Sequence, residues 1–182
     1  LAANTPLTAF SVWDLRSGKR KFSVRLGGRC FEPMLAFSAD SKRIFSTTQS
    51  SGIKVFDADT GKLIRQHSLQ RAFSLAMRPD GQVLALGFGD HIGLYDVSTW
   101  KEIDRLPGTG YAMSWRKDGR VLGVRDLSTL KLWQVSPRNL LRTLPKTRFF
   151  SWSVDRKILA TSDAQTIRFW EDSTGKELFK SQ

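Results

Sequence analysis

The sequence has little of the chemistry that metal sites and disulfide frameworks require. Its 182 residues include one cysteine, Cys30, which excludes an internal disulfide, and two histidines, which would need carboxylates to complete a metal site. No apolar run approaches the roughly 18–20 residues that a membrane-spanning helix needs. Acidic residues are also scarce, because 17 Asp and Glu stand against 29 Lys and Arg. We therefore expect no metal, no cofactor and no insertion into a membrane.

The composition is that of a folded chain with an excess of positive charge. Hydrophobic residues make up 40% of the sequence and charged residues 25%, which argues against intrinsic disorder. The length fits one domain that can bury a core. The net charge of +12 favours approach to an acidic partner, a nucleic acid or an anionic membrane surface.

The motifs of common catalytic classes are missing. The sequence has no Gly-x-x-x-x-Gly-Lys-Ser/Thr phosphate loop, no Gly-x-Ser-x-Gly nucleophile elbow and no His-Glu-x-x-His metal motif. Gly-Lys pairs at 18–19, 61–62 and 175–176 recur at one position of a repeat, so we interpret them as turns. We therefore expect that the protein is not an enzyme.

Two sequence markers recur together along the whole chain. Five segments share an apolar, a variable, an apolar and an aromatic residue, usually followed by an acid; the aromatic residues stand at 13, 56, 95, 133 and 170. Turn aspartates stand at 40, 80, 118 and 155 and keep the same phase. The spacing of both markers predicts an internal repeat of about 40 residues.

Each repeat is typical of β structure. In the repeat from Arg71 to Leu106, short apolar segments alternate with turns, and no helical period is sustained. Residues 83–88 are apolar on both faces, as in a strand between neighbouring sheets, whereas residues 102–106 are more polar. Asp80-Gly81 supplies the residues that a hairpin turn needs. The pattern predicts a four-stranded antiparallel sheet that becomes more exposed towards its last strand.

A four-stranded repeat whose third strand ends in an aromatic–acid pair resembles the WD40 family of β-propellers. The resemblance covers essentially the whole chain and includes the turns Asp57-Ala58-Asp59-Thr60-Gly61-Lys62 and Glu171-Asp172-Ser173-Thr174-Gly175-Lys176. The Gly-His pair that the family places before the first strand is absent. The expected fold is therefore all-β, a propeller of four-stranded antiparallel blades that apolar packing holds together.

The phase of the repeat predicts about four and a half blades, in one propeller or propeller fragment over residues 1–182. Half a blade at 7–26 would supply a third and a fourth strand, and complete blades would follow at about 31–68, 72–107, 111–145 and 148–181. A blade needs neighbours on both faces, so such a set would leave a face open at each end. We expect the chain to belong to a larger, seven-bladed ring. Association with a second copy, or closure as a five-bladed ring with residues 1–6 as a makeshift strand, are the alternatives.

The WD40 resemblance implies a non-catalytic scaffold that binds a protein or peptide partner, in the cytoplasm or, in a eukaryote, the nucleus. It places the contacts in loops that lead into the first strand of each blade. Trp100 breaks the phase of the other aromatic residues, so we expect it on the surface, as an exposed contact or in local packing. We expect His67 to be solvated. The candidate partner-binding residues are Arg29, Arg71, His91, Tyr111 and Arg148.

A second group of basic residues flanks the first hairpin turns, at the end of the blades opposite to these loops. This group is a candidate contact for a polyanion and supports the alternative of a basic scaffold associated with nucleic acid. Phosphate contacts would make such binding weaken steeply with salt, whereas an apolar peptide site would be much less sensitive. The group consists of Lys42, Arg43, Arg116, Lys117, Arg120, Arg156 and Lys157.

Overall fold

The computed structural model describes residues 9–26, 34–48, 52–69 and 72–181. Within these ranges the chain forms one two-stranded and four four-stranded antiparallel sheets, and it forms no helix. It therefore has no helix there that could cross a membrane. We call the two-stranded sheet the half-blade and the others blades 1 to 4.

Every complete blade is a meander, in which each strand pairs with the next one in the chain. The half-blade consists of β1 (Ala9–Trp13) and β2 (Arg20–Arg25); blade 1 of β3 (Leu35–Phe37), β4 (Arg43–Thr48), β5 (Gly52–Asp57) and β6 (Leu63–His67); blade 2 of β7 (Ser74–Met77), β8 (Val83–Gly87), β9 (His91–Asp96) and β10 (Glu102–Pro107); blade 3 of β11 (Ala112–Trp115), β12 (Val121–Asp126), β13 (Thr129–Gln134) and β14 (Asn139–Leu144); and blade 4 of β15 (Phe149–Trp152), β16 (Ile158–Ser162), β17 (Ile167–Glu171) and β18 (Glu177–Ser181).

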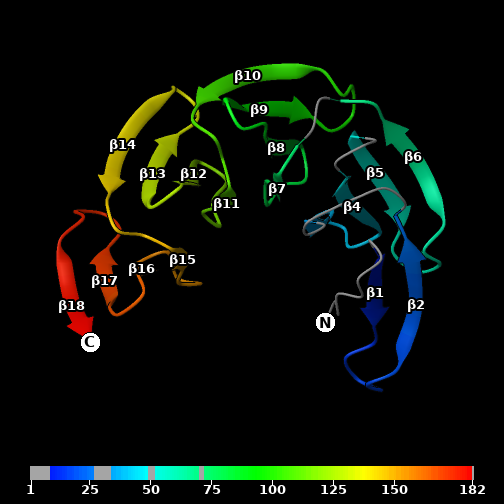
Figure 1. Cartoon of the computed structure of the whole chain (residues 1–182), viewed down its shortest axis with the longest axis horizontal. Coiled ribbons are helices and arrows are strands. Elements are labelled where there is room, and N and C mark those ends of the chain that lie inside the picture. Colours follow the sequence, from blue (N-terminus) through cyan, green and yellow to red (C-terminus); the bar gives the residue numbers. More distant parts are fainter. Residues whose placement is uncertain (1–8, 27–33, 49–51, 70–71, 182) are drawn as a thin grey trace.

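The sheets fan out along an arc (Figure 1). The first strands β7, β11 and β15 lie on the inner side of the arc, and the last strands β6, β10, β14 and β18 run along its outer rim. This radial arrangement confirms the expected all-β, propeller-like class. Membership of a seven-bladed ring stays a prediction.

The acid that ends the third strand stabilises the turn that follows it. In blade 2, Asp96 Oδ1 accepts hydrogen bonds from the backbone N–H of Thr99 at 2.7 Å and from the hydroxyl of Ser98 at 2.6 Å. The Ser98 hydroxyl and the Thr99 N–H lower the pKa of Asp96 to about 2. In blade 1, Asp57 Oδ1 accepts hydrogen bonds from the backbone N–H of Thr60 at 2.8 Å and from its hydroxyl at 2.7 Å. The recurrence of an acid at this position therefore has a local cause, because the turn needs an acceptor for its N–H groups.

The core lies between the sheets. Phe45 of blade 1 packs against Leu84 and Leu86 of blade 2, and all three are buried. The next junction buries Ile92 of blade 2 and Leu122 of blade 3. Because each sheet covers one face of the next, four apolar clusters follow one another along the described part of the chain.

The aromatic residues of the repeat contribute to these clusters. Phe56, Tyr95 and Trp133 of the third-strand series are buried, as the repeat predicts. Trp13 of the half-blade is 37% exposed. Trp115 adds a polar link, because its indole Nε1 donates a hydrogen bond to the backbone oxygen of Ala76 in the preceding blade at 3.0 Å.

His67 differs from the sequence expectation, and Trp100 takes one of its two expected roles. The half-buried Trp100 ring stacks on His67 with ring centroids 3.7 Å apart, and it also contacts Phe45. His67 is therefore not solvated: its Nε2 is buried, with no hydrogen-bond partner among the described residues. Burial lowers the pKa of His67 below its usual value, with a smaller contribution from Arg65. The stack joins the rim of blade 1 to that of blade 2, so Trp100 has the packing role that the sequence left open.

Candidate functional site

The antiparallel order of the strands gives each blade two distinct ends. The segment before the first strand and the second hairpin lie at one end, which we call the upper end; in blades 2 to 4 it includes residues 72–73, 108–111 and 145–148. The first and third hairpins lie at the lower end, which includes residues 78–82, 116–120 and 153–157. The two groups of candidate residues therefore occupy opposite ends of the blades.

Aromatic and basic side chains gather at the upper end. Phe73, Tyr111 and Arg148 each stand directly before the first strand of their blade. The rings of Phe73 and Tyr111 are 6.5 Å apart across two blades, and the guanidinium carbon of Arg148 lies 5.6 Å from the centroid of Phe149. Tyr111 is 42% and Phe149 65% exposed. Exposed aromatic rings beside arginine are the side chains that most often anchor protein–protein contacts.

Backbone hydrogen bonds hold these residues on the sheets. The N–H of Phe73 donates to Gly87, that of Tyr111 to Arg125 and that of Arg148 to Ser162. The turn before Tyr111 is tight, because a side chain at Gly110 (φ 61°) would meet Ile92 at 2.8 Å. The upper end is therefore a surface built on fixed strands.

His91 is near this surface but is not free to bind. Its imidazole stacks on Phe88 at 4.9 Å, its Nδ1 is 2.6 Å from a carboxylate oxygen of Asp90, and its side chain is only 12% exposed. The hydrogen bond with His91 lowers the pKa of Asp90. The stacking on Phe88 uses the His91 ring inside its own blade.

The structure describes only part of the predicted upper-end set. Tyr111 and Arg148 are exposed there, whereas Arg29 and Arg71 lie outside the described residues. Sequence reasoning missed Phe73, Phe149 and Leu127, the last of which is 70% exposed in the second hairpin of blade 3. The signal for Phe73 was present, because it stands at the same repeat position as Tyr111.

Internal ion pairs use some of the basic residues at the lower end. Arg116 binds Asp118 at 2.8 Å and Asp172 of blade 4 at 2.6 Å, and Arg156 lies 3.7 Å from Asp118. The Asp172 side chain is only 8% exposed. Arg116 therefore joins blades 3 and 4 and is not a free contact for a polyanion.

Other basic residues of this group remain available. Their side chains are exposed and have no ion-pair partner among the described residues. Arg43 also lines a hollow of about 400 Å³ between blades 1 and 2, beside Phe45 and Trp100. These residues are Lys42, Arg43, Lys117, Arg120 and Lys157.

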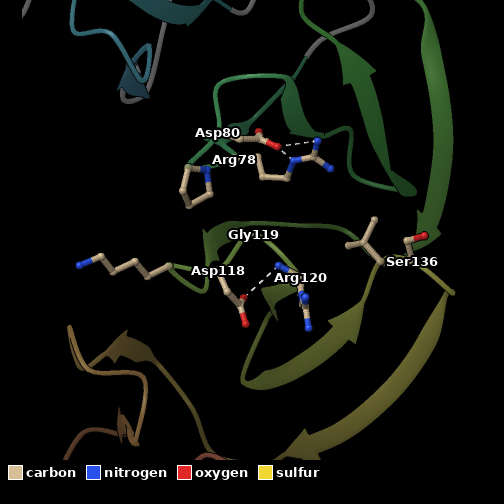
Figure 2. Close-up of a pocket in the computed structure, with 9 residues that line it drawn as sticks. Arg78, Asp80, Asp118, Gly119, Arg120 and Ser136 are labelled. Atoms are coloured by element: carbon tan, nitrogen blue, oxygen red, sulfur yellow. Dashed lines mark hydrogen bonds and ion pairs between the residues drawn. The ribbon is translucent and has the colours of Figure 1, made fainter.

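A larger hollow of about 550 Å³ lies between the first hairpins of blades 2 and 3 (Figure 2). Arg78 and Asp80 form an ion pair on one wall, and Gly119 and Arg120 belong to the other wall. Lys117, Asp118 and Val135 also line the hollow. The hollow is lined by charged groups of both signs, with the basic ones in excess.

Comparison with known proteins supports the fold and leaves the family open. No protein-family model and no curated protein sequence matches the chain. A chain in the crystal structure of a mitotic checkpoint complex superposes with a TM-score of 0.75 at 19% identity, over 96% of this chain and 60% of that one. A chain of hydrazine synthase from Kuenenia stuttgartiensis gives 0.68 at 17% identity, over 81% and 47%. This chain thus spans about half to three fifths of their length, and the likeness shows a propeller-like fold.

Proposed function

We propose that the chain is a non-catalytic, WD40-like propeller scaffold that binds a protein or peptide at its upper end, as a domain of a larger cytoplasmic protein. The observation that carries this proposal is that two aromatic-containing pairs, Phe73 with the exposed Tyr111 and Arg148 with the exposed Phe149, share the upper end of neighbouring blades. The likeness to a chain in a mitotic checkpoint complex, a protein assembly, is consistent with it.

The proposed mechanism is docking onto a preformed surface. A bound peptide would cover Tyr111 and Phe149, and removal of their ring area from water supplies about 25 cal/mol per Å². Arg148 would donate hydrogen bonds to backbone or carboxylate oxygens of the peptide. Because the backbone N–H groups of Phe73, Tyr111 and Arg148 are already bonded to neighbouring strands, little ordering is required on binding.

Peptide selection tests the proposal without a known partner. A random peptide library displayed on phage is selected on the wild-type chain, and the best peptides are synthesised and titrated by fluorescence anisotropy. Replacement of Tyr111 by Ala, or of Arg148 by Met, is expected to weaken binding about tenfold or more. Lys157→Met, an exposed change at the lower end, is the matched control and should leave the affinity unchanged. Selected peptides that bind both upper-end variants as tightly as the wild type would contradict the proposal.

The second candidate function is a basic scaffold associated with nucleic acid, which the net charge and the exposed cations Lys42, Lys117, Arg120 and Lys157 favour. A labelled 20-nucleotide single strand and a 20-base-pair duplex, each titrated at 50 and 200 mM salt, test it. This candidate predicts that the affinity of the wild type falls steeply with salt. In Lys117→Met and Arg120→Met the same increase in salt should reduce the affinity less. Binding of the selected peptides should change little over the same range, which separates the two functions.

A further inference from the structure

Two neighbouring junctions at the lower end have the same backbone plan but different contents. The junction of blades 3 and 4 contains an interblade ion network, whereas the junction of blades 2 and 3 contains the hollow of about 550 Å³. Because the repeat gives each residue of one junction a counterpart in the other, the charged groups of the junction of blades 3 and 4 can be compared with the residues that replace them at the junction of blades 2 and 3.

At the junction of blades 3 and 4 a carboxylate fills the space between the blades. Asp172 follows the third strand of blade 4, and its carboxylate binds Nη1 of Arg116 at 2.6 Å. Arg156, in the first hairpin of blade 4, reaches back to Asp118 at 3.7 Å. The backbone of Arg156 is in the left-handed region (φ 63°), which residues other than glycine rarely adopt. Both residues of blade 4 therefore extend charged groups to blade 3.

At the junction of blades 2 and 3 both of these groups are missing. Val135 stands at the repeat position of Asp172, and Gly119 at that of Arg156. Arg78 stands at the position of Arg116 and binds only its own hairpin, through Nε and Nη2, to Asp80 at 2.9 and 2.8 Å. Its Nη1 has no partner among the described residues. The guanidinium thus lacks the second carboxylate that Arg116 has.

The charge around the hollow suits an anion of one charge. Arg78, Lys117 and Arg120 line it together with Asp80 and Asp118. Asp118 is paired with Arg116 and Arg156, and Asp80 with Arg78. Lys117 and Arg120 are exposed and have no ion-pair partner within the described ranges. The two aspartates would repel a dianionic phosphate more strongly than a single carboxylate.

We propose that this hollow is a second binding site, which receives the carboxylate of an Asp or Glu side chain from an acidic segment of a partner protein. The carboxylate would take the place that Asp172 has one junction further, bound to Nη1 of Arg78, with Arg120 and Lys117 contributing attraction from the rim. Figure 2 shows Arg78 and Arg120 on the two walls between which it would lie. The site is at the lower end, so it does not depend on the proposed contacts at the upper end.

A titration of the ¹⁵N-labelled chain, followed by NMR, tests the site. The probe is the capped peptide acetyl-Gly-Glu-Glu-Gly-amide, and its Gln counterpart is the matched uncharged control. The Glu peptide is expected to shift the Arg78 side-chain Nε–H and the backbone amides of Gly119 and Arg120 in a saturable way. The Gln peptide should leave them in place. Equal shifts from both peptides would overturn the proposal.

Two variants test the proposed contact: one removes the cation and the other adds a competing internal carboxylate. Arg78→Met keeps the apolar stem that packs against Gly119 and removes the guanidinium, whereas Val135→Asp supplies an internal carboxylate at the position of Asp172. Each is expected to weaken binding of the Glu peptide about tenfold or more, the effect of one charge-assisted hydrogen bond. Lys157→Met, at the repeat position of Arg120 but on blade 4, is the matched control and should bind as the wild type does.

The outcomes separate the proposal from its alternatives. Unchanged binding by Val135→Asp overturns it even if Arg78→Met fails to fold. Saturable binding of inorganic phosphate or of the 20-nucleotide strand, tighter than the Glu peptide and lost in Arg78→Met, would also overturn it and assign the hollow to polyanions. Tyr111→Ala should leave the Glu peptide titration unchanged, because Tyr111 lies at the upper end. A failure of the upper-end proposal would therefore not affect the test of this hollow.

Discussion

Blades 2 and 4 have the same strand order, yet blade 2 is largely buried and blade 4 is more exposed. Ile92 and Ile167 make the comparison direct, because they are the same residue type at the same repeat position. Ile92 is fully buried, whereas Ile167 is 48% exposed. Blade 3 covers the face of Ile92, and no described sheet covers that of Ile167. In this architecture burial depends on having a neighbour more than on the residue itself.

The same contrast occurs at the other end of the arc. Trp115 and Phe37 stand at one repeat position, three residues before the turn aspartate. Trp115 is 7% exposed because it packs between blades 2 and 3, whereas Phe37 is 52% exposed. Phe37 lines an apolar hollow of about 220 Å³ with Phe10 and Leu35, beside the half-blade. Each end of the arc thus has an apolar face that further β structure could cover.

The largest expected effect comes from truncating the two isoleucines. Ile92→Ala should lower the free energy of unfolding by about 3 kcal/mol, because it leaves a cavity between blades 2 and 3. Ile167→Ala should cost less than about 1 kcal/mol, because water already reaches the side chain. Urea unfolding followed by fluorescence measures both. Equal losses would show that something covers Ile167 in solution and would remove the comparison.

A smaller effect is expected where an ion pair crosses a junction. Arg116→Met leaves the carboxylate of Asp172 buried without its partner, and this should cost about 2 kcal/mol. Arg78→Met breaks a pair within one hairpin and should cost less than about 1 kcal/mol. Thermal unfolding of both variants measures the difference. Similar losses from the two changes would mean that Asp172 adds nothing to the junction.

The stack of His67 on Trp100 predicts a dependence on pH at the junction of blades 1 and 2. Burial lowers the pKa of His67 in the folded chain below its unfolded value of 6.5, so the unfolded chain binds more protons. Stability should therefore fall as the pH falls below about 6.5. His67→Phe keeps an aromatic ring in the stack but cannot titrate. The stability of the wild type relative to the variant, measured by urea unfolding, should fall between pH 7.5 and 5. A stability difference that stays constant over this range would show that His67 contributes no proton linkage.

The smallest effect is expected at the third hairpin turns. Asp96 has a pKa of about 2, so its contribution to stability is present above about pH 3.8 and is lost as the pH falls towards 2. Asp96→Asn should lower the urea midpoint slightly at pH 7, and the difference from wild type should shrink at pH 2. Glu171→Gln makes the matching change in blade 4. A larger loss there than in blade 2 would contradict the view that the outer blade contributes less.

Much of the fold could be predicted because turn residues and apolar runs, which act locally, define the repeat. Asp96 and Asp57 cap turns that the sequence shows directly, and apolar runs such as Val83–Gly87 mark the buried strands. The five sheets lie within the five ranges that the phase of the repeat gives. Turn chemistry and hydrophobic patterning act over a few residues, so a single sequence reveals them.

The candidate sites were harder to predict because they depend on contacts between blades. Arg116 and Asp172 are 56 residues apart in the chain, and only the arc brings them together. His67 was expected to meet water, and Trp100 to be an exposed contact or to pack locally; in the structure each ring covers the other. The repeat indicates at which end of a blade the basic residues lie. It could not show which of them are neutralised by an acid on the next blade.

The radial order of the strands has a consequence for how the molecule opens. All five residues of β18 are exposed, whereas those of β8 are buried. Amide protons are released to solvent through the least costly local opening. Hydrogen–deuterium exchange should therefore spread from the rim of the last blade inwards, and any molecule that docks against that blade would reveal itself by slowing the exchange there first.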